Sequence, residues 1–445
     1  MRPPNLPRKA RAPGGGKPRP YKKSMHHFQY KNGILHAEGV AIPKIVKAAG
    51  TPVYVYSLAT LTRHFQVFDE AFGDVPHLIC YSMKCNSNLA ILSAFAKLGG
   101  GIDIVSQGEL YRALKAGCNP RKIVFSGVGK TEEEIAYALR KNILMFNVES
   151  AQELEAIDRV ARKLRKKAPI SLRVNPDIDP KTHPYITTGM KKSKFGIQYE
   201  EAEPLYDRAA KLKGIEVVGV DCHIGSQLTE VQPFIDALHK VLALVKKLRD
   251  KKIPIRYLDL GGGLGIRYDD ENPPSPQEYA AALKKELQGL GLTLIFEPGR
   301  VLMGNAGILV TELIYTKDRD NKKFYIVDAA MNDLIRPAFY DSYHEIKPVK
   351  EQSRAKAVVD VVGPICESGD FLATDREIAE YRPGELMAIM SAGAYGFSMA
   401  SNYNARPRAC EVLVDGKKFH VIRKRESYED LIRGEKIPRL SSRTK

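Results

Sequence analysis

The chain has 445 residues, is 44% hydrophobic and carries a formal net charge of +17. This length and apolar content exclude a wholly disordered chain and fit one large domain with a smaller one. No apolar run approaches the ~18 residues of a membrane-spanning helix, so we expect no membrane partner. The charge suggests a nucleic-acid partner, but +12 of it lies in residues 1–24 and 423–445. The body of the chain is therefore only slightly basic, and we expect no nucleic-acid partner.

The N-terminal segment, residues 1–24, contains eight basic residues, no acidic residue and many Pro and Gly. Such a segment cannot bury apolar surface, so we predict a disordered basic tail. It lacks the apolar stretch of a secretory signal, and its Pro and Gly content disfavours the amphipathic helix of an organelle transit peptide. The six cysteines show no C-x-x-C pair and no metal-like spacing with His. We therefore predict reduced thiols, no metal site and a cytoplasmic location.

From residue 78 to residue 296, short apolar runs alternate with amphipathic segments of helical spacing, such as 132–142 and 151–167. Continuous apolar runs are typical of buried parallel strands, which need crossing helices between them. Eight such units predict an α/β fold with a closed (β/α)8 TIM-type barrel, which we place at residues 58–305. An open doubly wound sheet explains the alternation but not the count. The eight runs are 78–83, 101–105, 122–126, 143–148, 169–174, 217–222, 257–260 and 292–296.

After about residue 305 the pattern changes to short strand-like runs separated by Gly, Asp, Asn and Pro. This pattern predicts a separate C-terminal antiparallel β domain. Residues 25–57 contain further strand-like runs, and we assign them, with residues 306–445, to this β domain with a basic C-terminal end. The runs after residue 305 are 311–318, 323–330, 355–363, 386–393, 408–416 and 417–424.

In a (β/α)8 barrel the active site lies at the carboxyl ends of the strands, so the residues just after each run are the candidates for it. Lys84 ends an apolar run, where a charged amine is costly unless it is paired or neutralised. Burial would lower the pKa of this amine and make it a nucleophile. The alternative is a strand-end lysine whose amine reaches solvent. The other residues at these positions are Ser106, Glu149, His223, Gly261, Gly262, Gly263, Glu297 and Arg300.

The glycine run Gly261–Gly263 permits close backbone approach and could cradle a phosphate, although an ordinary barrel turn explains it equally well. It matches neither a P-loop nor a dinucleotide-binding fingerprint. His223 is either a core histidine or a ring that stacks on an aromatic ligand, with Ser226 near a phosphate. Glu297 needs a cationic partner, for which Arg300 and a protonated ligand nitrogen are both candidates.

Seven motifs in order closely resemble the pyridoxal-phosphate-dependent decarboxylases of the alanine-racemase-like barrel group (fold type III), specifically the diaminopimelate decarboxylase family. The resemblance extends over about residues 27–425. It implies a barrel followed by a β domain, the cofactor pyridoxal 5′-phosphate, and conversion of meso-2,6-diaminopimelate to L-lysine and carbon dioxide as the last step of lysine biosynthesis. The motifs are YSMKCN, SKFGI, HIGSQ, DLGGGLG, EPGR, CESGD and AGAYGFSMASNYN.

The resemblance also implies a role for each matching residue. Lys84 would bind the cofactor covalently, His223 would stack on its pyridine ring, and Glu297 would pair with the pyridine nitrogen. Cys366 would reprotonate the substrate carbon, from a segment that reaches into the neighbouring subunit's site, so the resemblance implies a homodimer with shared active sites. The remaining cofactor contacts would be Ser226, Gly261, Gly262, Gly263, Gly299, Arg300 and Tyr395. The substrate contacts would be Arg300, Arg336, Tyr340, Glu367 and Tyr395.

Ser82 and Cys85 stand where the family motif more often has alanine. Neither side chain should contact the ring, so the assignment is unchanged.

The sequence leaves four other functions to be weighed. An ornithine- or arginine-type decarboxylase on the same fold would act on a substrate without a distal carboxylate, which leaves Arg300 and Arg336 near a cation. A racemase needs bases on both faces of the ring. A catalytically silent cofactor-binding homologue has no need of Lys84, Cys366 and Glu297. Nucleic-acid binding through the tails has charge but lacks stacking aromatics at binding-motif spacing.

Overall fold

The computed structural model describes residues 25–178, 193–320 and 322–439. The predicted disordered tail, residues 1–24, lies outside the described residues, as do the last six residues of the predicted β domain, 440–445.

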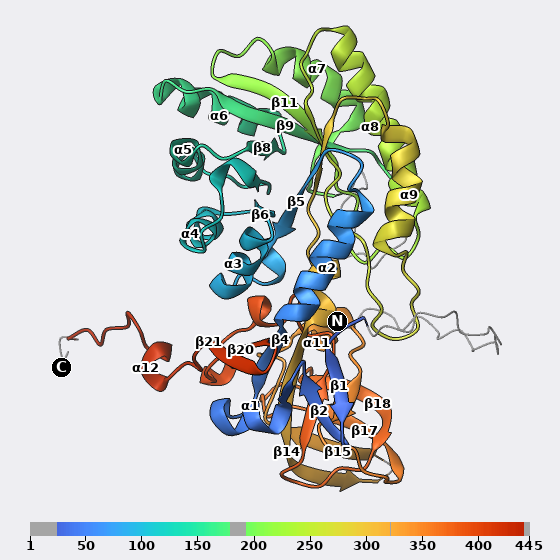
Figure 1. Cartoon of the computed structure of the whole chain (residues 1–445). Helices are drawn as coiled ribbons and strands as arrows, with labels where there is room; N and C mark the ends of the chain where they lie inside the picture. Colours follow the sequence, from blue (N-terminus) through green and yellow to red (C-terminus); the bar gives the residue numbers. More distant parts are fainter. Residues whose placement is uncertain (1–24, 179–192, 321, 440–445) are drawn as a thin grey trace.

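The eight predicted apolar runs form one closed parallel barrel (Figure 1). Each strand pairs in parallel with the next, and the last pairs with the first, which closes the sheet. The barrel prediction is confirmed, and the open sheet is excluded because such a sheet would leave two unpaired edges. The strands are β5 (His77–Ser82), β6 (Gly101–Ile104), β7 (Ile123–Phe125), β8 (Met145–Val148), β9 (Ala168–Asn175), β11 (Ile215–Asp221), β12 (Tyr257–Asp259) and β13 (Thr293–Phe296). A short strand, β10 (Ile197–Gln198), adds to β9.

Helices surround the barrel strands and bury their apolar faces against them (Figure 1). Several begin at a Ser, Thr or Asn whose side chain accepts a backbone N–H, and Thr131 and Ser275 form full capping boxes. The helix expected over 151–167 ends at Lys163, because Arg165 takes the left-handed conformation with φ +54°. The helices are α2 (Leu58–Ala71), α3 (Leu89–Lys97), α4 (Gln107–Lys115), α5 (Glu132–Lys141), α6 (Ala151–Lys163), α7 (Tyr199–Ala209), α8 (Gln232–Asp250) and α9 (Pro276–Leu287).

A second, nine-stranded sheet lies beside the barrel (Figure 1). Most of its pairings are antiparallel, which confirms the predicted antiparallel β domain, and two pairs, β15–β17 and β4–β20, are parallel. Both parallel pairs join strands separated by long connections, so no hairpin imposes the antiparallel direction. The strands are β4 (Val53–Ser57), β14 (Gly307–Arg319), β15 (Lys322–Val327), β16 (Ile346–Pro348), β17 (Lys356–Val362), β18 (Phe371–Ala379), β19 (Leu386–Ile389), β20 (Cys410–Asp415) and β21 (Lys418–Arg423).

The N-terminal residues form a small separate sheet of β1 (Phe28–Lys31), β2 (Ile34–Ala37) and β3 (Val40–Ala41), followed by helix α1 (Ile42–Ala49). Their apolar side chains pack with those of β4, β14 and β20 in a second core cluster. Among the helices of the described ranges, none is both long and apolar enough to cross a membrane.

Hydrogen bonds fix the second sheet against the loop that follows β5. The Tyr395 backbone N–H and the Ser398 hydroxyl both donate to the Cys85 carbonyl, at 2.8 and 3.1 Å. The Glu411 carboxylate of β20 accepts from Asn88, at the start of α3, at 2.9 Å. These contacts place the segment around Tyr395 directly beside Lys84.

The aromatic cluster behind β13 offers a test of the barrel's packing. Phe296 is fully buried, and its ring centre lies 4.3 Å from that of Phe72. We expect Phe296→Ala to lower the free energy of unfolding by about 3–5 kcal/mol, because it leaves a cavity. Tyr315→Ala, at a 64% exposed position on β14, should change it by less than about 1 kcal/mol. Equal losses for the two variants in urea unfolding would contradict this account of the core.

Candidate active site

One cavity at the carboxyl ends of the barrel strands collects most of the residues singled out from the sequence. It does not collect Cys366 and Glu367, which are exposed elsewhere on the same chain, where Glu367 accepts from the Tyr403 hydroxyl at 3.4 Å. The predicted residues that line the cavity are Lys84, His223, Ser226, Gly261, Gly262, Gly263, Glu297, Gly299, Arg300, Arg336, Tyr340 and Tyr395.

Lys84 lies in a short 3-10 turn, Met83–Cys85, directly after β5. Its amine is 3.1 Å from the buried Asp103 carboxylate, while its side chain is 41% exposed toward the cavity. The Ser82 hydroxyl donates to the same Asp103 oxygen at 2.6 Å. Burial lowers the pKa of the Lys84 amine, but the charge and hydrogen bond of Asp103, together with the nearby Tyr395 and Glu297, outweigh burial and the net pKa is raised. The expectation of a lowered pKa is therefore wrong, because the sequence did not reveal Asp103 as a partner.

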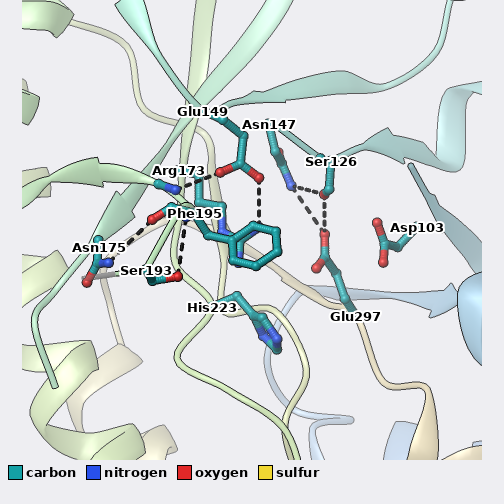
Figure 2. Close-up of polar contacts among 12 residues, drawn as sticks. Asp103, Ser126, Asn147, Glu149, Arg173, Asn175, Ser193, Phe195, His223 and Glu297 are labelled. Atoms are coloured by element: carbon teal, nitrogen blue, oxygen red, sulfur yellow. Dashed lines mark hydrogen bonds and ion pairs between the residues drawn. The ribbon is translucent and has the colours of Figure 1, made fainter. Parts of the chain in front are cut away.

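Glu297 follows β13, lines the cavity and is buried, and Figure 2 shows its contacts with Ser126 and Asn147. Its Oε1 accepts from the Ser126 hydroxyl at 3.1 Å and from the Asn147 amide at 3.2 Å. Burial, with the nearby charges of Asp103 and Asp259, raises the pKa of the Glu297 carboxyl well above its usual value. A carboxylate in such a place favours a cationic partner from a ligand.

Arg300, the protein partner considered for Glu297, makes other contacts. Its guanidinium donates to the Ser226 hydroxyl at 3.0 Å and to the Tyr268 hydroxyl at 2.8 Å. The Tyr268 ring also lies 5.3 Å from the Arg336 guanidinium carbon. Burial raises the pKa of Tyr268, but the two arginines more than offset burial and the net pKa is lowered. The sequence reasoning missed Tyr268, since it stands in a polar loop without a motif.

His223 follows β11 and offers an uncharged ring. Burial, reinforced by the charges of Arg173 and Lys84, holds the pKa of His223 well below its usual range. The Gly262 backbone N–H donates to His223 Nδ1 at 3.2 Å, so the neutral ring carries its proton on Nε2. Such a ring can stack on an aromatic ligand without repelling a cationic one.

The glycine run has no room for side chains. A Cβ on Gly262 would lie 2.3 Å from the Glu297 carbonyl oxygen, and one on Gly261 would lie 2.6 Å from His223 Nδ1. Gly261 and Gly263 also have φ values of +63° and +115°, which disfavour other residues. The loop therefore brings bare backbone to the cavity wall.

An ion pair ties a further loop to the cavity (Figure 2). Arg173 donates to Glu149 at 2.7 Å, and the other Glu149 oxygen accepts the Gly196 N–H at 2.6 Å. The Arg173 guanidinium carbon lies 4.9 Å from the ring centre of Phe195, which lines the cavity. The pair thus fixes the SKFGI loop at the mouth of the barrel.

These groups fit pyridoxal phosphate. The amine of Lys84 can take its aldehyde, and the neutral His223 ring can face its pyridine. The close-packed glycine loop, with Ser226 and Arg300, offers phosphate donors, a cradle that a single added Cβ would fill. The buried Glu297 carboxylate suits a protonated pyridine nitrogen.

Comparison with known proteins agrees with this fit. The family model described as "Pyridoxal-dependent decarboxylase, pyridoxal binding domain" matches residues 58–304. The diaminopimelate decarboxylase of Pseudomonas aeruginosa is 54% identical over 413 residues, which cover 93% of this chain and 99% of that protein. The diaminopimelate decarboxylase of Aquifex aeolicus is 52% identical over 412 residues, covering 92% and 98%.

Solved structures show the same likeness. The diaminopimelate decarboxylase of Helicobacter pylori complexed with L-lysine aligns with a TM-score of 0.85 and 46% identity, covering 88% of this chain and 98% of that one. The diaminopimelate decarboxylase of M. jannaschii in co-complex with L-lysine aligns with a TM-score of 0.88 and 40% identity, covering 92% and 98%.

The Asp103–Lys84 pair predicts how the lysine titrates. Asp103→Asn removes the charge that raises the pKa of Lys84, so its amine should be labelled by an amine-reactive reagent at lower pH than in the parent chain. The measurement is the pH midpoint of Lys84 labelling, followed by peptide mass spectrometry. Asp360→Asn, which removes the partner of Lys322, is the matched control and should leave the Lys84 midpoint unchanged. A Lys84 midpoint that Asp103→Asn does not move would contradict this assignment.

Proposed function

The chain belongs to the diaminopimelate decarboxylases of the pyridoxal-dependent decarboxylase family, and we propose that it converts meso-2,6-diaminopimelate to L-lysine and carbon dioxide. The observation that carries this is the meeting, in one cavity, of an accessible lysine, a buried carboxylate and two buried arginines. Relatives at about 50% identity over nearly the whole chain support it, and they do not favour the ornithine- or arginine-type alternative. The reaction makes lysine, so we place it at the last step of lysine biosynthesis.

Bound pyridoxal phosphate supplies an electron sink, which accepts the electron pair left on the substrate carbon when carbon dioxide departs. Lys84 would hold the cofactor through its amine. Glu297 would pair with the pyridine nitrogen and keep it protonated, and His223 would cover one face of the ring. Ser226, the glycine loop with Gly299, Arg300 and Tyr395 would hold the phosphate.

We assign cofactor binding to the barrel, residues 58–305, and part of substrate binding to the β domain formed by residues 25–57 and 306–445. Arg336 and Tyr340 come from helix α11 (Arg336–Tyr340), between strands of the second sheet, and both line the cavity. Arg336 is 5% exposed, and its Nε makes no hydrogen bond within the part of the chain that the structure describes. A buried guanidinium with an unused N–H donor is well placed to bind a carboxylate of the substrate. Ornithine and arginine carry no distal carboxylate to meet it.

We also propose that the active protein is a homodimer, with Cys366 and Glu367 of one chain completing the site of the other. On their own chain both are exposed and outside the cavity. Placed at a partner's cavity, the Cys366 thiol could donate a proton to the substrate carbon and Glu367 could meet the distal ammonium. All six cysteines are free thiols, which agrees with a cytoplasmic location.

The substrate proposal is tested by carbon dioxide release from meso-diaminopimelate, ornithine and arginine. The parent chain should release it from diaminopimelate alone. Arg336→Ala should lower kcat/KM for diaminopimelate about 10- to 100-fold, because it removes a charge-assisted pair worth about 1.5–3 kcal/mol. Arg354→Ala, which removes a partly exposed pair with Glu385, is the control and should leave kcat/KM near the parent value. Faster release from ornithine, or an unchanged kcat/KM in Arg336→Ala, would refute the substrate assignment.

Shared sites predict complementation between two inactive variants. Lys84→Ala and Cys366→Ala should each be nearly inactive alone. After unfolding and refolding as an equal mixture, half of the dimers should contain one chain of each variant, and each mixed dimer has one intact site out of two. The mixture should therefore recover roughly a quarter of the parent activity. Mixing without subunit exchange is the control. An inactive refolded mixture that contains mixed dimers would show that the site is not shared.

A further inference from the structure

We infer that Asn147 is a positioning residue that orients the Glu297 carboxylate toward the cofactor, and this inference rests on the proposed function. Asn147 does not touch the cavity; it lies on β8, inside the barrel, and is 0% exposed. It therefore acts through Glu297 rather than on substrate.

The contacts of Asn147 show how it can fix Glu297 (Figure 2). Its Nδ2 lies 3.2 Å from Glu297 Oε1, 3.2 Å from Asp259 Oδ2 and 3.1 Å from Ser126 Oγ. The Ser126 hydroxyl in turn donates to the same Glu297 oxygen at 3.1 Å. One amide and one hydroxyl thus direct their hydrogens to Oε1. The carboxyl group cannot rotate without losing both bonds.

The orientation of the amide is itself set from the next strand. The Ser171 hydroxyl, on β9, donates to Asn147 Oδ1 at 2.6 Å. If the amide were reversed, its oxygen would face the oxygens of Asp259 and Glu297, and its NH2 would face a hydroxyl donor. Ser171 therefore directs the two amide hydrogens at the two carboxyl groups.

Charge explains why an amide is needed here. The carboxyl oxygens of Asp221, Asp259 and Glu297 lie within 4.8 Å of one another, and all three groups are buried. Burial raises the pKa of each carboxyl and favours its protonated form, and the charges of the other cluster members and of Asp103 add to this effect, while Lys84 and Arg173 oppose it at Glu297. Asp259 also accepts the Gly261 N–H at 2.9 Å, so hydrogen bonds hold the cluster together. Without Asn147, Glu297 would bind a proton more readily and lose its pairing with a cationic ring nitrogen.

The test measures the dissociation constant of pyridoxal phosphate across pH by absorbance titration of the purified full chain. Asn147→Leu keeps the size of the side chain but removes its donors. It should weaken binding about tenfold near neutral pH and move the acid limb of the binding curve to higher pH. Ser126→Ala should move the limb in the same direction by less. Glu297→Gln should remove the part of the limb that Glu297 causes and leave the part that Lys84 causes, and adding Asn147→Leu to it should cost little more.

Asn332→Leu controls for loss of a buried asparagine, since Asn332 is 2% exposed and donates to Ser401. It should leave both the affinity and the acid limb unchanged even if it lowers Tm. Parent-like affinity and pH dependence in Asn147→Leu and Ser126→Ala would overturn the inference, and Ser126→Ala decides alone if Asn147→Leu does not fold. A parent chain that binds no pyridoxal phosphate would instead refute the proposed function.

Discussion

A buried carboxyl group must be paired or protonated, and among the described residues of the barrel Asp103, Asp221, Asp259 and Glu297 are buried near the cavity. Asp103 is paired with Lys84 and Ser82, while Asp259 accepts bonds from Asn147 and Gly261. Asp221 Oδ1 makes no hydrogen bond to the described residues, and burial raises the pKa of this carboxyl. Glu297 receives two neutral donors on one oxygen and lines the cavity. Glu297 is therefore the carboxyl group with which a cationic ligand would pair.

The need to pair buried carboxyl groups also explains how the two parts of the chain that form the cavity are held together. The barrel supplies Lys84, Glu297 and Arg300 at its strand ends, and the second sheet supplies Arg336 and a segment around Tyr395. The Glu411 carboxylate joins the two, because it accepts from Tyr56 at 2.8 Å, from Asn88, and from Arg423. A shift of the second sheet would therefore separate Arg336 from the Lys84, Glu297 and Arg300 side chains of the barrel.

Sequence reasoning located most groups at strand ends because the barrel brings the ends of distant strands together. It could not locate Asn147, Ser126 or Asp103, since each lies within or at the end of an apolar run and carries no motif. Their partners come from other strands, some of them neighbours and some on the opposite side of the closed barrel. The parallel pairing of β4 with β20 was not predicted either, because the whole barrel separates these two strands in the chain. Cys366 and Glu367 were assigned to the site by resemblance, and a single chain does not bring them there.

The central claim is that Lys84 holds pyridoxal phosphate at the mouth of the barrel. The direct measurement is to incubate the full chain with the cofactor, reduce it with sodium borohydride, digest it and map the modified lysine by mass spectrometry. The account predicts a reduced pyridoxyl phosphate on the peptide that contains Lys84, and its loss in Lys84→Ala. Modification at another lysine, or none after saturation with cofactor, would contradict it.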